Sequence, residues 1–211
     1  MNLIFDLDGT LVDSAPGIMV ALEHALEKSD VAASHVLTSD LIGPPLREML
    51  LKILGSSADL KVLELIEGEF KRFYDEKGVL LTRKFPGIDE MLGALSKKQF
   101  NLFIATNKRS RPTLILLEHL CWINFFKKIY SLDTISPPAN NKTILLESII
   151  TTNELDKMKT IYIGDRLEDA RAASNCGIKF LYASWGGYEN DENTKIFNIL
   201  NLPSDIEKHL H

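Results

Sequence analysis

The sequence has little cysteine, no long apolar run and no glycine-rich nucleotide motif. Its two cysteines, Cys121 and Cys176, stand alone in their segments, belong to no CxxC pair and make a poor disulfide framework. No uncharged apolar stretch approaches the length needed to cross a bilayer. Neither GxGxxG nor GxxxxGK[ST] occurs, and the five histidines show no metal-ligand spacing. These absences argue against dinucleotide binding, P-loop chemistry and a histidine metal site.

Basic residues are also fewer than acidic ones. The 211 residues include 24 Lys and Arg against 29 Asp and Glu, which gives a formal net charge of -5 and a sequence pI of about 5.6. That balance argues against a broad nucleic-acid surface. The opening MNLIF is too short and lacks the basic flank of a signal peptide. We therefore expect a cytoplasmic protein that binds neither nucleic acid nor a membrane, and its oligomeric state is unknown.

Five short apolar runs alternate with longer helical patterns. They are Leu3–Phe5, Leu102–Ala105, Ile129–Leu132, Ile161–Ile163 and Lys179–Ala183. Runs that are apolar on both faces and separated by helices predict a parallel sheet covered on both sides. Open sheets of this kind bind ligands outside the carboxyl ends of their strands. Asp6, Thr106 and Asp165 lie at such ends and are therefore candidate site residues.

The pattern after the first run is purely helical as far as Pro86-Gly87. Apolar residues recur at helical spacing in Leu60–Tyr74, and a second helix is expected after Gly43-Pro44-Pro45. Leu46, Met49, Leu50 and Ile53 share one face of that second helix. We predict an α/β fold, with a Rossmann-like parallel sheet core formed by residues 1–14 and 85–211. Residues 15–84 form an inserted helical cap domain in this prediction.

The strongest local pattern is Asp6-Leu7-Asp8-Gly9-Thr10, in which two carboxylates follow a predicted strand. A carboxylate can attack a phosphoryl group when a cation offsets the charge of both partners. A second carboxyl group can then protonate the departing oxygen. Gly9 has no Cβ, so the backbone there can come close to phosphate oxygens. The competing interpretation is an acidic turn that caps the next helix.

Asp6–Ser14 resembles the opening motif of the haloacid dehalogenase superfamily, and more narrowly of its phosphoglycolate phosphatase-like branch with a helical cap. The remaining motifs follow in order. Thr106-Asn107-Lys108 resembles the second motif, Lys142 the third, and Gly164–Asp169 the fourth. The family commonly has proline after the third-motif lysine, whereas this chain has Thr143, which keeps the cation and loses a backbone constraint.

The resemblance implies roles for individual residues. Asp6 would be the nucleophile, and Asp8 would protonate the leaving alcohol and then deprotonate water. Thr106, Asn107 and Lys142 would bind the phosphate, where a fixed ammonium stabilises charge in the transition state.

A magnesium ion would be held by Asp6, the backbone carbonyl of Asp8, and Asp165, since hard oxygen ligands suit this metal. Asp169 is expected to act through water or by orienting Lys142, and the adjacent Glu168 is an alternative.

Two further segments are similar to parts of the same branch. Gly43–Glu48 resembles the segment that faces the substrate, and Arg47 there could pair with a substrate carboxylate or second phosphate. The simpler interpretation of Arg47 is a solvated arginine on a helix. Trp185-Gly186-Gly187-Tyr188 resembles a loop of the branch, and we expect it to pack beneath the site.

The resemblance therefore implies a magnesium-dependent phosphomonoester hydrolase that forms an aspartyl-phosphate on a small, phosphoglycolate-like phosphorylated metabolite. One alternative is a phosphomutase-type phosphoryl transferase, which Thr10 after Gly9 mildly disfavours. Another is a non-catalytic binding protein on the same fold, although such proteins typically lose a motif carboxylate. Phosphoglycolate, a sugar phosphate, a nucleotide monophosphate and pyrophosphate all stay open as substrates.

Overall fold

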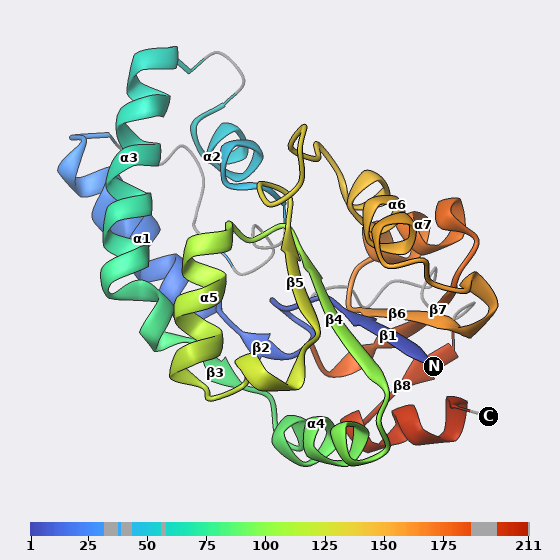
Figure 1. The fold of residues 1–211 in the computed structure, drawn as a ribbon. Coiled ribbons are helices and arrows are strands. Elements are labelled where there is room, and N and C mark those ends of the chain that lie inside the picture. The colour runs from blue at the N-terminus through green and yellow to red at the C-terminus, as the bar shows by residue number, and fades with distance from the viewer. Residues whose placement is uncertain (32–37, 39–43, 56–57, 187–197, 211) are drawn as a thin grey trace.

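The structure is a computed structural model that describes residues 1–31, 38, 44–55, 58–186 and 198–210. Its central feature is a six-stranded sheet in the order β5-β4-β1-β6-β7-β8 (Figure 1). The strands are β1 (Asn2–Phe5), β4 (Asn101–Thr106), β5 (Lys128–Ser131), β6 (Thr160–Gly164), β7 (Lys179–Ala183) and β8 (Asn198–Leu200). All neighbouring pairs are parallel. The predicted α/β fold with a parallel sheet is confirmed.

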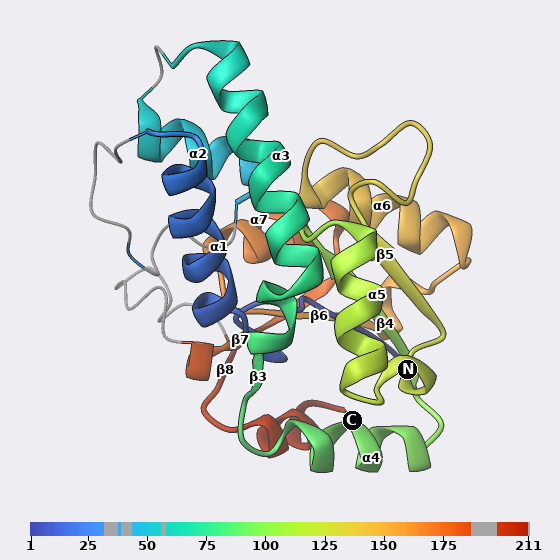
Figure 2. The same cartoon turned by 90° about the vertical axis from the view of Figure 1, so that its left-hand side faces the viewer.

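Three helices, α1 (Ala15–Lys28), α2 (Leu46–Leu54) and α3 (Leu60–Glu76), follow the first strand. They lie between two short strands, β2 (Val12–Asp13) and β3 (Arg83–Lys84), which pair antiparallel. The prediction of a purely helical pattern is therefore wrong at its edges, because a two-residue strand is too short to show a period. We call residues 15–82 the helical insert. Its helices α1 and α3 lie side by side (Figure 2).

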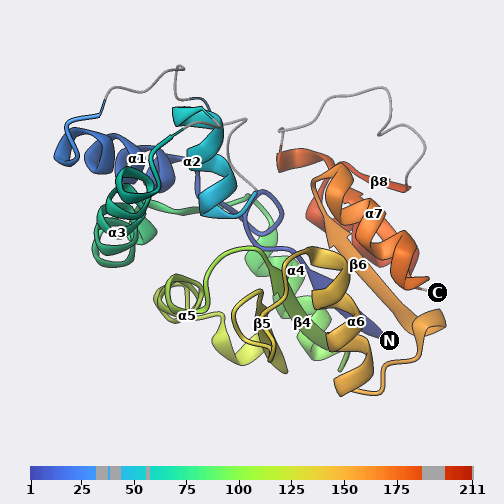
Figure 3. The same cartoon turned by 90° about the horizontal axis from the view of Figure 1, so that it is seen from above.

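The insert helices bury the apolar faces that the sequence indicates. Helix α3 begins at Leu60 as predicted and buries Leu63, Ile66, Phe70 and Tyr74. Helix α2 buries Met49, Leu50 and Ile53, while Leu46 is half-buried. Seen from above, the insert lies to one side of the sheet (Figure 3). The division of the chain into a core and a cap domain stays a prediction.

Helices cover both faces of the sheet because side chains alternate along each strand. Leu3 and Phe5 belong to one buried cluster with α4 (Ile88–Lys97), α5 (Ser110–His119) and the insert. Ile4 faces the opposite way and packs in a second cluster with α6 (Lys142–Thr152) and α7 (Leu167–Cys176). In Figure 1, α6 and α7 lie above the sheet and α4 lies below it.

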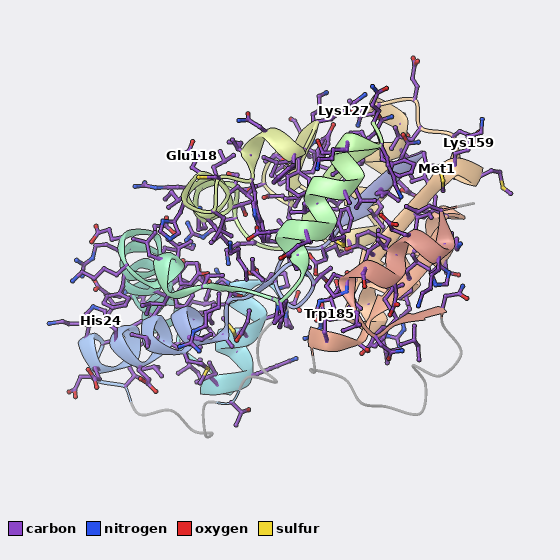
Figure 4. The ribbon with its side chains drawn as sticks, turned by 90° about the horizontal axis from the view of Figure 1, so that it is seen from below. Met1, His24, Glu118, Lys127, Lys159 and Trp185 are labelled. Atoms are coloured by element: carbon purple, nitrogen blue, oxygen red, sulfur yellow. The ribbon has the colours of Figure 1, made fainter. Side chains whose placement is uncertain are left out.

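Short 3-10 segments complete the described chain: η2 (Gly78–Leu81), η3 (Ile123–Phe125), η4 (Lys157–Lys159), η5 (Ser184–Gly186) and η7 (Pro203–His209). Met1, Lys127 and Lys159 precede β1, β5 and β6 and lie at one end of the molecule, whereas His24 of α1 lies at the other (Figure 4). The insert therefore lies beyond the carboxyl ends of the strands. No helix in the described ranges is long and apolar enough to cross a membrane.

Candidate active site

The three central strands bring the predicted strand-end residues to one edge. Asp6 directly follows β1, Thr106 is the last residue of β4, and Asp165 directly follows β6. Because β4 and β6 flank β1, the carboxyl ends of all three strands are neighbours. The backbone N–H of Asp6 donates to the carbonyl of Ile163 at 2.9 Å, which extends the pairing by one residue. The sequence-based expectation that these ends meet is confirmed.

Asp6, Asp165 and Asp169 form a buried acidic cluster. One carboxylate oxygen from each lies within 4.8 Å of the others. The Asp165 side chain accepts a hydrogen bond from the hydroxyl of Thr10 at 2.8 Å through Oδ1. Its Oδ2 is buried and, within the described residues, has no hydrogen-bond partner. Burial raises the pKa of Asp165 well above its usual range, and the charges of Asp6 and Asp169 raise it further.

This donor set fits a divalent cation. Three carboxylates in one buried place repel each other, and a cation would offset that repulsion and give Asp165 Oδ2 a partner. The ligand atoms are hard oxygens, the type that magnesium binds. Asp8 is not part of the cluster, because its carboxylate is turned toward Lys108.

Lys142 is the cation that faces this cluster. Its ammonium lies 2.9 Å from Asp6 Oδ1, 2.9 Å from Asp169 Oδ1 and 2.8 Å from the hydroxyl of Tyr162. Only 2% of its side chain is exposed. Burial alone would lower the pKa of Lys142, but the charges of Asp169 and Asp6 outweigh burial and raise it. Lys142 therefore stays protonated across the physiological range.

The same contacts define the state of Asp6. Burial raises the pKa of Asp6 to about 7, the charge of Lys142 opposes this, and Asp169 adds to it. Asp6 is thus a carboxyl group held against one fixed cation, with the Asp169 side chain close by.

The structure distinguishes Asp169 from Glu168. Asp169 is buried and accepts from Lys142, from the hydroxyl of Tyr162 at 2.8 Å and from the backbone N–H of Arg166 at 3.3 Å. Glu168 is half-buried and is not in the cluster. This geometry fits an orienting role of Asp169 toward Lys142. Sequence reasoning missed Tyr162, since a tyrosine inside a buried strand gives no signal beyond core packing.

Lys108 is a further candidate site residue. It belongs to the segment that resembles the second motif, but the sequence assigned it no role. Its ammonium lies 3.0 Å and 3.2 Å from the two carboxylate oxygens of Asp8. It also donates to the hydroxyl of Tyr74, on insert helix α3, at 2.6 Å. Burial alone would lower the pKa of Lys108, but Asp8 and Tyr74 outweigh it and raise the pKa. The sequence feature that could have indicated a role for Lys108 is its position two residues after the end of β4.

Gly9 is required by close packing at this edge. Its φ is +90°, and a Cβ added there would lie 2.1 Å from Asp165 Oδ2. The glycine therefore makes room for the Asp165 carboxylate as well as for a ligand. A Cβ on Gly186 would lie 2.2 Å from the carbonyl oxygen of Gly9.

The Trp185 loop supports the same turn. Its indole N–H donates to the carbonyl of Thr10 at 2.8 Å, and Trp185 is labelled in Figure 4. Packing of this loop against the site is confirmed for Trp185 and Gly186, while Gly187 and Tyr188 lie outside the described residues.

Thr106, the last residue of β4, and Asn107, which follows it, are predicted to bind phosphate, and both lie at this edge of the sheet. The buried Thr106 hydroxyl accepts from the backbone N–H of Lys108 at 3.1 Å. Asn107 lines a cavity together with Asp8. Their contact with phosphate stays a prediction.

Arg47 is placed apart from Asp8. Its guanidinium lies 3.4 Å from Glu67 within the insert, and 48% of its side chain is exposed. It lines a neighbouring cavity with Glu67, Lys71 and Asp133, and not the cavity that contains Asp8. Gly43, the first residue of the predicted substrate-facing segment, lies outside the described residues.

Buried aspartates and a lysine at the carboxyl edge of a parallel α/β sheet are an arrangement suited to enzymes that act on phosphate groups. Residues 3–183 match the family model of the haloacid dehalogenase-like hydrolases, and the chain belongs to this family. It lies in the phosphoglycolate phosphatase-like branch and is a phosphatase.

Similar proteins support that placement. The chain is 30% identical over 207 residues to a phosphoglycolate phosphatase of Aquifex aeolicus, covering 98% of this chain and 94% of the relative. It is 28% identical to a 5'-nucleotidase of Pseudomonas aeruginosa, and the match covers 90% of this chain and 86% of the relative. The solved structure of a haloacid dehalogenase-like hydrolase from Streptococcus pneumoniae is similar with a TM-score of 0.85 and 26% sequence identity. The match covers 100% of this chain and 98% of that structure's chain.

Proposed function

We propose that the protein is a magnesium-dependent hydrolase of small phosphomonoesters and acts through an aspartyl-phosphate on Asp6. The observation that supports this most is the contact of Lys142 with both Asp6 and Asp169, next to Asp165. Asp6, the proposed nucleophile, contacts the buried ammonium of Lys142 and also belongs to the acidic cluster that could hold a metal. That is the charge arrangement that a phosphoryl group needs in order to approach a carboxylate.

In the first half-reaction, a carboxylate oxygen of Asp6 forms a bond to phosphorus as the bond to the alcohol oxygen breaks. The carboxyl group of Asp8 gives its proton to that departing oxygen. Lys142 stabilises the phosphoryl oxygens during transfer, and Thr106 and Asn107 donate hydrogen bonds to them.

In the second half-reaction, a water molecule attacks the phosphorus of the aspartyl-phosphate. Asp8 takes the proton from that water, and the bond between phosphorus and the Asp6 oxygen breaks. Inorganic phosphate leaves and Asp6 returns to its carboxylate form.

A magnesium ion held by Asp6, the backbone carbonyl of Asp8, and Asp165 would supply positive charge to offset the phosphate and carboxylate charges. The buried Asp165 Oδ2, which has no hydrogen-bond partner in the described part of the chain, supports this assignment. Asp169 keeps Lys142 in place in this proposal. The substrate is a small-molecule phosphate ester, and neither nucleic acid nor a membrane is a proposed partner.

The test is phosphate release from a panel of phosphomonoesters by the purified protein, with magnesium and after chelation. We expect turnover with magnesium and loss of turnover after chelation. Transfer of the phosphoryl group to a sugar without phosphate release would favour the phosphomutase-type alternative. Binding without either reaction would favour a non-catalytic protein, although the motif carboxylates Asp6, Asp8 and Asp165 are all present.

A further inference from the structure

The cavity beside Asp8 has two different walls. The sheet side contributes Asp8, Asn107, Lys108 and Arg109. The insert side contributes apolar side chains from all three of its helices. If Asp8 serves the leaving oxygen, as in the proposed function on which this inference rests, the alcohol part of the substrate lies in this cavity.

The apolar wall is built from closely packed groups. Met49 of α2 and Phe70 of α3 are buried, and Leu46 of α2 is half-buried beside them. The rings of Phe70 and Tyr74 stack at a centroid distance of 5.4 Å with planes 7° apart. Apart from the hydroxyl of Tyr74, which accepts from Lys108, these side chains carry only carbon atoms and the sulfur of Met49, which favours an apolar occupant.

Both cations that line this cavity, among the residues the structure describes, already have carboxylate partners. Lys108 contacts both oxygens of Asp8. Arg109 forms a two-point pair with Asp75 of α3, with nitrogen–oxygen distances of 3.1 Å and 2.5 Å. Asp75 is 9% exposed and holds both terminal guanidinium nitrogens of Arg109, so a substrate carboxylate would compete with Asp75 for this cation.

From this arrangement we propose that the substrate is the phosphate ester of an uncharged alcohol that carries an apolar ring or chain. A hydroxy acid such as glycolate would bring a carboxylate into a cavity with an apolar wall. Its two cations, Lys108 and Arg109, are already paired with Asp8 and Asp75. This inference departs from the phosphoglycolate-like substrate that the family resemblance implies.

Four substrates with primary-alcohol leaving groups test the proposal on the wild-type enzyme with magnesium: benzyl phosphate, 4-carboxybenzyl phosphate, ethyl phosphate and phosphoglycolate. We expect kcat/KM for benzyl phosphate to exceed that for ethyl phosphate by about 10-fold or more, as filling an apolar pocket does. The added carboxylate should lower kcat/KM by about 10-fold relative to benzyl phosphate. A kcat/KM for phosphoglycolate or 4-carboxybenzyl phosphate equal to or above that for benzyl phosphate would overturn the proposal.

A matched pair of variants tests the apolar wall itself. Leu46 and Leu51 are both half-buried on α2, but only Leu46 is among the residues around the cavity. Leu46→Gln should lower the ratio of kcat/KM for benzyl over ethyl phosphate by about 5-fold, while Leu51→Gln should leave that ratio unchanged. Met49→Gln provides a second variant in the wall. An unchanged ratio in both wall variants, each shown to be folded by its melting curve, would contradict the proposal.

The outcomes separate this inference from the proposed function. Hydrolysis of none of the four esters would overturn the proposed function and the inference with it. Hydrolysis of all of them with phosphoglycolate preferred would overturn the inference and leave the proposed function standing.

Discussion

Asp6 lies where strand β1, the ammonium of Lys142 and the acidic cluster meet. Asp6→Asn keeps the size of the side chain and removes its negative charge, so the nucleophile is lost with little change in packing. We expect kcat to fall by about 1,000-fold or more while the melting temperature stays at or above that of the wild type. Phosphate release and thermal melting measure the two effects. Near-normal turnover in this variant would exclude the aspartyl-phosphate mechanism.

Lys108 is the second residue whose replacement is informative. Lys108→Met removes the ammonium that contacts both oxygens of Asp8 and keeps most of the side-chain length. We expect kcat to fall by about 10- to 100-fold, because Asp8 loses the partner that positions it at the leaving oxygen. Steady-state kinetics on one phosphomonoester measure this. Lys71→Met, at a half-buried lysine of α3 paired with Glu67, is the control and should keep wild-type kcat.

The sequence predicted the site residues that belong to a recognisable motif. It gave no role to Lys108 or Tyr162, whose contacts with the site form only in the folded chain. Asp6 and Asp8 are two positions apart at a strand end, so the pattern itself predicts them. The contact of Lys108 with Asp8 spans 100 positions, and its contact with Tyr74 spans 34. The first contact depends on the pairing of β1 with β4, and the second depends on how the insert packs against the sheet. No local pattern encodes either.

At the scale of elements, Arg47 of α2 lines a cavity that adjoins the one beside Asp8 and shares Leu46, Asn107 and Arg109 with it. Arg47 pairs with Glu67 of α3, and this exposed contact contributes little stability. We therefore expect Arg47→Ala to change kcat/KM by less than about 3-fold on any phosphomonoester. A loss of about 10-fold restricted to anionic substrates would restore the sequence-based role of Arg47 in specificity. The measurement is kcat/KM for phosphoglycolate and benzyl phosphate in the same preparation.

The elements that could be predicted are those with a long or strongly apolar pattern. The runs at 102–105 and 161–163 became β4 and β6, extended by one residue at each end. Strand β8 was missed because it has three residues, of which Asn198 and Ile199 are exposed. Strands β2 and β3 were missed for a similar reason, since each has two residues and pairs only with the other.

At the scale of the whole molecule, the acidic cluster links metal binding to stability. A cation that binds the folded state and not the unfolded state raises the free energy of unfolding, by about 2.7 kcal/mol at 100 times its dissociation constant. For a domain of this size that corresponds to a rise in Tm of about 5 °C or more. We expect magnesium chloride to produce this rise and a chelator to reverse it, as measured by thermal melting.

Asp165→Asn is the matched control for that measurement. It removes one ligand and one of three mutually repelling charges. Its Tm without metal should equal or exceed that of the wild type, and its response to magnesium should be lost. A full magnesium response in this variant would place the metal elsewhere.

The paired strands β2 and β3 carry both covalent connections between the helical insert and the sheet. Because the two strands pair with each other, a rotation of the insert relative to the sheet would have to bend or twist this one ribbon. In Figure 2 the lower end of α3 lies near β3 and α2 lies at the far end of the insert. A rotation of the insert about this ribbon would therefore carry α2 further than the end of α3 next to β3.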